Sequence, residues 1–183
     1  MCHGMAPNFG TNMKYLTSQY LSLMHAFADH AISRLDNPEN SWQYPIAMLQ
    51  EYGTLRLDGG RQTGKTEAVS QFAADWLSEG NSVVVIANKS EYARDTCDRI
   101  KRRWKVLESL DKENGVLMHD TVRSFLSGKD KFRGISLKRT LFIIEEPIRI
   151  PEMYKFYEAW DDLSVCYSVN KPKLPLFFVL GIQ

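Results

Sequence analysis

The sequence has few cysteines, and none of them forms a recognisable pair. Cys2, Cys97 and Cys166 are far apart, no Cys-x-x-Cys is present, and the four histidines do not stand beside them at the spacing of metal ligands. These absences argue against a disulfide-stabilised scaffold and against a zinc site. They are typical of free thiols in a reducing cytosol.

Net charge and long apolar runs are also lacking. With 23 Lys and Arg against 22 Asp and Glu the formal net charge is +1, so a nucleic-acid binder is not indicated by overall charge, and any basic surface has to be local. No apolar run approaches the roughly 18 residues of a membrane span. The first residues lack a basic segment followed by an apolar one. We therefore expect no membrane partner and a cytoplasmic location, which is the host cytoplasm if the protein is viral.

The composition that remains is that of a globular protein. Of 183 residues, 44% are hydrophobic and 25% charged, which fits one domain with a short extension. Residues 1–13 show no periodicity and predict a loose tail. From 14 to 35 apolar residues recur at helical spacing, and Asn37-Pro38 ends that helix. We divide the chain into an amino-terminal tail and amphipathic helix, 1–41, and a second domain, 42–183.

In the second domain, expected strands alternate with expected helices. The strands are expected at 54–58, 82–88, 115–119, 141–145 and 175–181. The helices are expected at 45–52, 67–79, 90–107 and 151–160, with a further short helix that follows the strand 115–119 and ends at 125. The runs at 82–88 and 141–145 are continuously apolar, as in strands buried on both faces. The alternation predicts an α/β fold of three layers, in which a mostly parallel sheet is flanked by helices and the crossovers are right-handed.

The segment GGRQTGKT, at 59–66, matches the phosphate-binding loop pattern and lies between an expected strand and an expected helix. Glycines let backbone N–H groups turn toward phosphates, and the following helix directs its positive end at the same anion. The predicted phosphate-binding residues are Gly59, Gly60, Arg61, Gln62, Thr63, Gly64, Lys65 and Thr66.

Within this loop two residues have specific roles. Lys65 is expected to reach the β- and γ-phosphates of ATP and to assist catalysis, and the Thr66 hydroxyl to coordinate Mg²⁺. The alternative is a glycine-rich turn that precedes a helix by chance, and the strand–loop–helix context argues against it. Such a loop predicts binding of ATP and Mg²⁺ and does not by itself predict turnover.

Two adjacent glutamates end the apolar strand in LFIIEEP, at 141–147. Successive strand residues point to opposite sides, so the two carboxylates can serve different purposes. We expect Glu145 to face the metal and Glu146 to orient and deprotonate the attacking water. The alternative is a surface pair at a strand end. A further strand separates this acid from the phosphate loop, which favours the NTPases with an additional strand and a glutamate base over nucleotide kinases.

Taken together, these motifs resemble the ATPase motor of the large terminase subunit of tailed phages. GGRQTGKT carries Arg-Gln inside the loop, VVVIANKSEYARDTCDRI is similar to the second strand and helix of that family, and FRGISLKRTLFIIEEP resembles its Arg-Gly segment and acidic strand. The resemblance covers roughly 42–183. It implies a RecA-like P-loop ATPase of phage or phage-derived origin that acts in DNA metabolism or packaging.

The sequence departs from that family near its end. Terminase large subunits continue into a nuclease domain, and this sequence ends before one. The last strand reads VLGIQ instead of a Thr/Ser-rich coupling segment, and Gly181 with Gln183 is similar to the Gly…Gln sensor of DNA helicases. Two functions stay open. One is an ATPase that works on or near DNA, as a motor or a helicase-like loader; the other is a slow or non-hydrolysing nucleotide-binding regulator that docks on a larger phage machine.

Other side chains have both a functional and a structural interpretation. Arg61 either contacts and senses the γ-phosphate or points to solvent. The resemblance implies an upstream glutamine that reads adenine, and Gln43 is the candidate, with Gln50 as competitor. Alternatively, the aromatic neighbours of Gln43, Trp42 and Tyr44, anchor the amino-terminal helix onto the sheet.

Arginines near the acidic strand are candidates for completing the site of a neighbouring subunit in a homo-oligomer. Arg133, Arg139 and Arg149 flank that strand, and the alternative for such lone arginines is an ordinary surface position.

On the helix 90–107 a basic stripe could meet DNA phosphates. Acidic residues lie on or next to the same face, so we favour a solvated mixed-charge surface. The basic residues are Arg94, Lys101, Arg102 and Lys105, and the acidic ones are Glu91, Asp95 and Asp98.

Overall fold

The structure is a computed structural model, and it describes residues 16–107, 115–128, 132, 135, 137–145, 150–166 and 173–181. Its elements are α1 (Thr17–Leu35), the 3-10 helix η1 (Pro38–Asn40), α2 (Pro45–Glu51), β1 (Thr54–Leu57), α3 (Lys65–Ser78), β2 (Ser82–Ala87), α4 (Ser90–Leu107), β3 (Val116–Thr121), α5 (Val122–Leu126), β4 (Thr140–Glu145), α6 (Ile150–Cys166) and β5 (Leu176–Leu180). The expected alternation of strands and helices is therefore confirmed. The largest difference is α6, which continues beyond residue 160.

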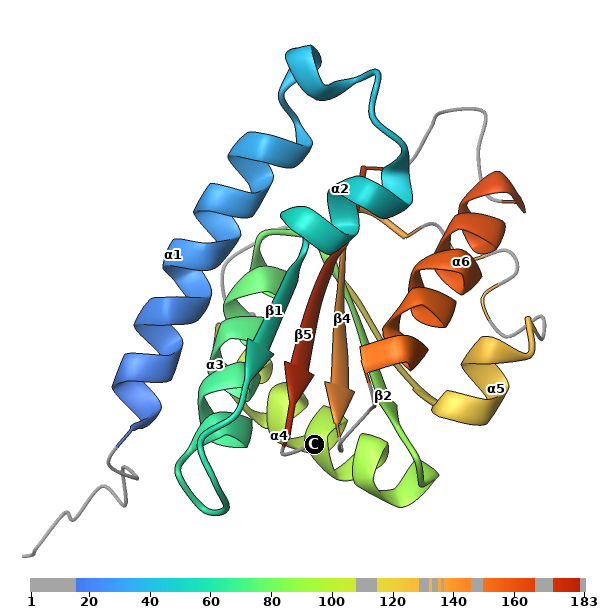
Figure 1. Cartoon of the computed structure of the whole chain (residues 1–183). Coiled ribbons are helices and arrows are strands. Elements are labelled where there is room, and N and C mark those ends of the chain that lie inside the picture. The colour runs from blue at the N-terminus through green and yellow to red at the C-terminus, as the bar shows by residue number, and fades with distance from the viewer. Residues whose placement is uncertain are drawn as a thin grey trace, which may run out of the picture.

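The five strands form one sheet in the order β1-β5-β4-β2-β3, and every pairing is parallel. Parallel pairing brings the carboxyl ends of all the strands to one edge, which is the lower edge in Figure 1. The last strand, β5, lies between β1 and β4. The loop that follows β1 and the end of β4 therefore face the same side of the molecule, one strand apart.

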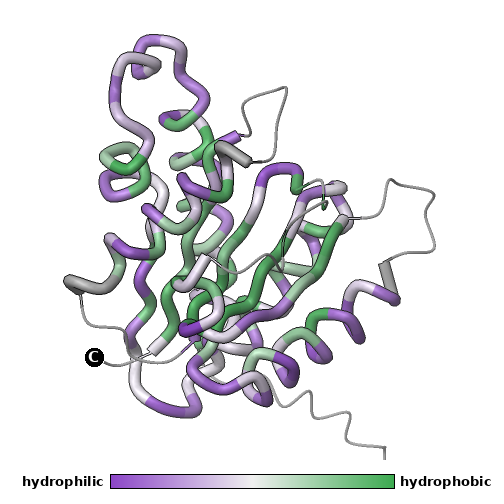
Figure 2. The backbone as a smooth tube through the Cα atoms, turned by 90° about the vertical axis from the view of Figure 1, so that its right-hand side faces the viewer, coloured by the Kyte–Doolittle hydropathy of each residue, from purple (hydrophilic) through white to green (hydrophobic). Residues whose placement is uncertain are grey.

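Alternation along each strand divides the core between the two faces of the sheet. Val83 and Val85 of β2 belong to a cluster with α1, α3 and α4, whereas Val84 and Ile86 belong to a cluster with α2, α5 and α6. Helices thus cover both faces, as expected, and this explains why the strands read as continuous apolar runs. In Figure 2 the hydrophobic segments gather in the strands, and the hydrophilic segments lie mostly on the surrounding helices and turns.

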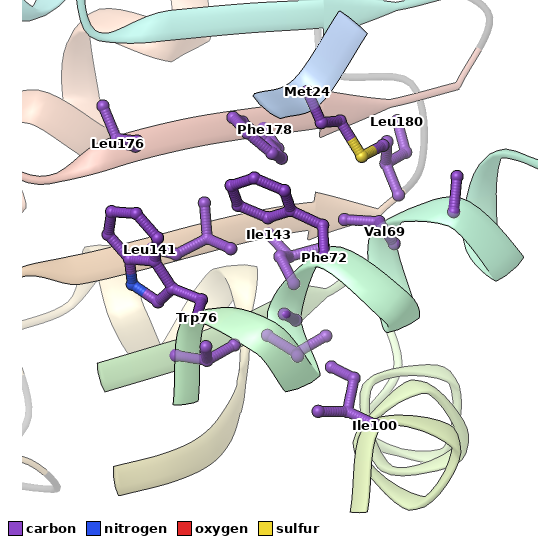
Figure 3. Close-up of a cluster of buried hydrophobic side chains, with 14 of the residues drawn as sticks. Met24, Val69, Phe72, Trp76, Ile100, Leu141, Ile143, Leu176, Phe178 and Leu180 are labelled. Carbon is purple, nitrogen blue, oxygen red and sulfur yellow. The ribbon is translucent and has the colours of Figure 1, made fainter. Parts of the chain in front are cut away.

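Helix α1 shares the core of the sheet. Its residues Met24, Ala28 and Ala31 are buried in the same cluster as α3 and β5. Met24 points toward β5, where the ring of Phe178 lies against Phe72 of α3 (Figure 3), with 5.1 Å between the ring centroids. A fully buried methionine such as Met24 contributes about 2 kcal/mol of hydrophobic stabilisation, so α1 is anchored to the sheet.

The two ends of α1 reach opposite edges of the sheet. Near its start, the Tyr20 hydroxyl donates to Thr63, in the loop that follows β1. At its end, the carboxylate of Asp36 accepts from the guanidinium of Arg139, the residue that directly precedes β4. Arg139 is 5% exposed. Both the expected surface position of Arg139 and its expected availability to a neighbouring subunit are therefore wrong, because burial and an ion pair commit it to the amino edge of the sheet.

Candidate functional site

The loop between β1 and α3 depends on left-handed backbone. Gly60 has φ 72°, Gly64 has φ 102°, and Gln62, between them, has φ 58°. An added Cβ at Gly60 would meet nothing within 4 Å, so glycine is required there by the backbone angle and not by lack of room. Left-handed backbone costs a residue such as Gln62 about 1 kcal/mol, and residues under such strain gather at ligand sites.

Lys65 lies over this loop as the first residue of α3. Its ammonium donates to the carbonyl oxygen of Gly60, and to Thr63 Oγ1 at 3.4 Å. The N-cap residue is Gly64, which supplies no side-chain acceptor to the first turn. The positive end of the helix and the Lys65 charge therefore both lie at this loop, and such a combination favours anions. Thr66 follows in the same turn and is exposed.

The acidic strand reaches the same edge of the sheet at the same height. Glu145 pairs in register with Leu180 of β5, and Leu180 pairs on its other side with Leu57, the last residue of β1. Neighbouring strands lie about 4.8 Å apart, so the backbones of Glu145 and Leu57 are roughly 10 Å apart. A ligand seated on the loop after Leu57 therefore has a carboxylate available from across β5.

Glu145 has a partner that sequence reasoning missed. The hydroxyl of Thr96, on α4, donates to Glu145 Oε1 at 2.7 Å, and Thr96 is only 2% exposed. The helical spacing could have indicated that Thr96 is buried. It stands three residues after Ala93 and four before Ile100, on the same face of α4, and both of those residues are buried. A hydroxyl on the buried face of a helix needs an acceptor, and here the acceptor is the predicted metal ligand.

The structure leaves the roles of several predicted site residues open. Arg61 and Gln62 are exposed within the loop itself, and both interpretations of Arg61 stay predictions. Four others lie outside the described residues, so their roles also stay predictions: Glu146, Arg133, Arg149 and Gln183.

Gln43 lies away from the phosphate loop. Its backbone N–H donates to the carbonyl of Asn40, and the side chain of Asn40 donates to the carbonyl of Arg34, near the end of α1. The connection from α1 to α2 lies at the upper edge in Figure 1, opposite the phosphate loop. Its neighbours Trp42 and Tyr44 are 78% and 84% exposed, so the interpretation of these aromatics as an anchor is wrong.

The outer face of α4 is a mixed-charge surface, as favoured. Both its basic and its acidic residues are exposed: Glu91, Arg94, Asp95, Asp98, Lys101, Arg102 and Lys105. An open groove of about 510 Å³ lies on the surface where this helix packs beside α3, and Arg99, Arg102 and Arg103 contribute to its lining. Arg103 pairs there with Glu67, in the first turn after the phosphate loop.

Asp75 lines the same groove. Burial raises the pKa of its carboxyl above the ordinary value, and the nearby His25 opposes this rise. The carboxylate of Asp75 lies 3.9 Å from the imidazole of His25. The groove therefore carries acidic as well as basic groups, and its charge does not select one class of partner.

The described residues hold neither a cluster of metal-ligating side chains nor a membrane-spanning helix. Within them no group of three or more His, Cys, Asp and Glu side chains is arranged to hold a metal ion. A Mg²⁺ ion on bound phosphates needs fewer protein ligands, since phosphate oxygens and water complete its shell; Thr66 and Glu145 stay its predicted ligands. No helix in the described part of the chain is long and apolar enough to cross a membrane.

Comparison with known proteins places the chain in a phage protein family. It is 41% identical, over 196 aligned residues, to an uncharacterized 25.0 kDa protein of the regB-denV intergenic region of Enterobacteria phage T4. The alignment spans 100% of this chain and 89% of the phage protein, so the chain belongs to the family of that protein. The predicted phage or phage-derived origin agrees with this relationship. No family model matches the chain.

Proposed function

We propose that the protein is a Mg²⁺-dependent P-loop ATPase that binds ATP at residues 59–66. The observation that carries the proposal is the position of Lys65 and Thr66 in the first turn of α3, directly after a left-handed loop that leaves the carboxyl end of β1. In open parallel sheets, ligands bind in the crevice outside the carboxyl ends of the strands. The phosphate-loop motif therefore stands where its mechanism needs it.

The order of the strands supports the RecA-like class with an additional strand. In the sheet β5 separates the phosphate-loop strand β1 from the acidic strand β4. The proposed ligand between loop and carboxylate is a triphosphate with its metal and an attacking water. The roughly 10 Å between the strand ends fits such a ligand better than direct contact of the two strands would.

Each role falls to a specific group. Backbone N–H groups of the loop and the Lys65 ammonium hold the phosphates, with Arg61 as a further contact to the γ-phosphate. Thr66 and Glu145 would hold Mg²⁺, which neutralises charge that develops on the phosphates. Glu146, which directly follows β4 in the sequence, is the proposed base that removes a proton from the attacking water.

The biological setting of the proposed ATPase is DNA metabolism or packaging in the infected cell. The support is the sequence resemblance to terminase motors together with the phage relative. The alternative, a regulator that binds ATP and turns it over slowly or not at all, requires the same loop but not Glu146. We propose hydrolysis because Glu146 directly follows Glu145 in the sequence.

Turnover measurements separate these functions. Phosphate release should be detectable with Mg²⁺, absent with a chelator, and faster with double-stranded or single-stranded DNA if the protein works on it. ATP binding without any phosphate release, with or without DNA, would support the regulator instead. A protein that neither binds nor hydrolyses ATP would contradict both.

A further inference from the structure

A tyrosine from the amino-terminal helix enters the phosphate loop. The Tyr20 hydroxyl donates to Thr63 Oγ1 at 3.2 Å. A Cβ added at Gly59 would lie 1.9 Å from that same hydroxyl. Gly59 is not among the residues with positive φ, so its own backbone does not demand glycine. A side chain at position 59 would have to displace the Tyr20 hydroxyl, so the first glycine of the motif leaves space for the tyrosine.

The Thr63 hydroxyl connects Tyr20 to the loop lysine. A hydroxyl has one proton to donate and two lone pairs that accept. Thr63 Oγ1 donates to the carbonyl of Gly60 at 3.4 Å, accepts from Tyr20, and accepts from Lys65 Nζ at 3.4 Å. These three contacts use its full capacity, so the Thr63 hydroxyl has one preferred orientation, and Tyr20 helps to set it.

Tyr20 is itself fixed by the core. It stands four residues before Met24 and eight before Ala28, on the face of α1 that packs against α3 and β5. Met24 lies against this core in Figure 3. A group on a packed helix can hold a loop more accurately than another loop residue can, because little of its freedom remains.

We propose that Tyr20 is a positioning residue for phosphate binding. Its hydrogen bond to Thr63 holds the Thr63 hydroxyl, and through it the Lys65 ammonium, where the β- and γ-phosphates are received. This inference deepens the proposed function and rests on it. Through Tyr20, helix α1 supports the affinity of the loop for a triphosphate.

The test compares two tyrosines that each bond a threonine. Tyr20→Phe removes the bond to Thr63. Tyr157→Phe removes a bond of 2.7 Å between the Tyr157 hydroxyl and Thr54, which lies at the amino end of β1, away from the phosphate loop. The probes are Mg²⁺-ATP and inorganic tripolyphosphate, whose binding needs no base. We expect Tyr20→Phe to weaken both by about fivefold, and Tyr157→Phe to leave both within twofold of the parent while lowering thermal stability.

Changes at Thr63 separate positioning from general destabilisation. Thr63→Ser keeps the hydroxyl and should lose less affinity for both probes than Thr63→Val does. In Thr63→Val, which lacks the hydroxyl, adding Tyr20→Phe should cause no further loss, because the shared bond is already gone. Additive losses, or a Tyr20→Phe protein with unchanged affinity for both probes, would overturn the inference alone. A parent protein that binds neither probe would overturn the proposed function and this inference with it.

Discussion

Thr96 Oγ1 lies 2.7 Å from Glu145 Oε1 and links the buried face of α4 to the acidic end of β4. Thr96 is 2% exposed, and hydrogen bonds to a charged acceptor are stronger than neutral ones. The bond therefore fixes the orientation of Glu145 from the protein side. If Glu145 holds Mg²⁺, Thr96 determines how well it is placed to do so.

Replacing Thr96 by Val should weaken the metal site while preserving side-chain shape. Removing a group that orients a metal ligand typically costs about tenfold in metal affinity. We expect the Mg²⁺ concentration for half-maximal ATP binding to rise by about that factor. Thr140→Val is the matched control. Thr140 is likewise a buried threonine, but it lies at the start of β4, at the opposite end of the strand from Glu145, and donates to the carbonyl of Lys138. An equal response of both variants would contradict this role of Thr96.

Glu145, the last residue of β4, and Glu146, which follows it in the sequence, should respond differently to substitution. Glu146→Gln keeps the size of the side chain and removes the base, so ATP should still bind while hydrolysis falls by about 10²-fold or more. Glu145→Gln should instead reduce the dependence of ATP binding on Mg²⁺. Single-turnover phosphate release and Mg²⁺ titrations distinguish the two variants. Turnover that is unchanged in Glu146→Gln would remove Glu146 from the catalytic role.

The ion pair between Asp36 and Arg139 should contribute to stability and not to catalysis. Asp36→Asn leaves the buried Arg139 without a carboxylate, and we expect a loss of about 2 kcal/mol in unfolding free energy. Lys173 lies 3.9 Å from Asp36 but is 68% exposed, so Lys173→Ala should cost less than about 0.5 kcal/mol. Urea unfolding measures both. A smaller loss for Asp36→Asn than for Lys173→Ala would show that the buried pair is not stabilising.

Self-association should raise the rate of hydrolysis per chain. ATPases that resemble this protein often take an arginine from a neighbour to stabilise charge in phosphoryl transfer. Since Arg139 is committed to Asp36, Arg133 and Arg149 are the arginines to replace first. We expect the rate per chain to rise across a roughly hundredfold range of protein concentration. A flat rate, with a monomer by light scattering and no response to DNA, would assign the role to Arg61 of the same chain.

The local parts of the fold could be predicted from the sequence because they depend on short-range patterns. Each of these patterns spans only a few residues. The two apolar runs form the strands β2 and β4, and the motif at 59–66 forms a left-handed loop followed by the start of α3. The position of Glu145 opposite the loop follows from parallel pairing once β5 is placed between β1 and β4.

The long-range contacts that support the site and the fold could not be predicted in this way. Tyr20 and Thr63 are 43 residues apart, Thr96 and Glu145 are 49 apart, and Asp36 and Arg139 are 103 apart. No local periodicity encodes such pairs, because they depend on how α1 and α4 pack onto the sheet. Gln43 shows the converse error, since its place in the sequence before the loop does not bring it near the loop in space.

The most direct test of nucleotide binding is a calorimetric titration of Mg²⁺-ATP into three proteins. The parent should bind, Lys65→Ala should lose tight binding because backbone amides cannot replace its charge, and Lys101→Ala should bind as the parent does, since Lys101 is an exposed lysine of α4. All three should unfold at similar temperatures, because Lys65 lies over the loop and not in the core. Equal affinity of the parent and Lys65→Ala, or no binding by the parent, would contradict the assignment of residues 59–66 as a phosphate-binding loop.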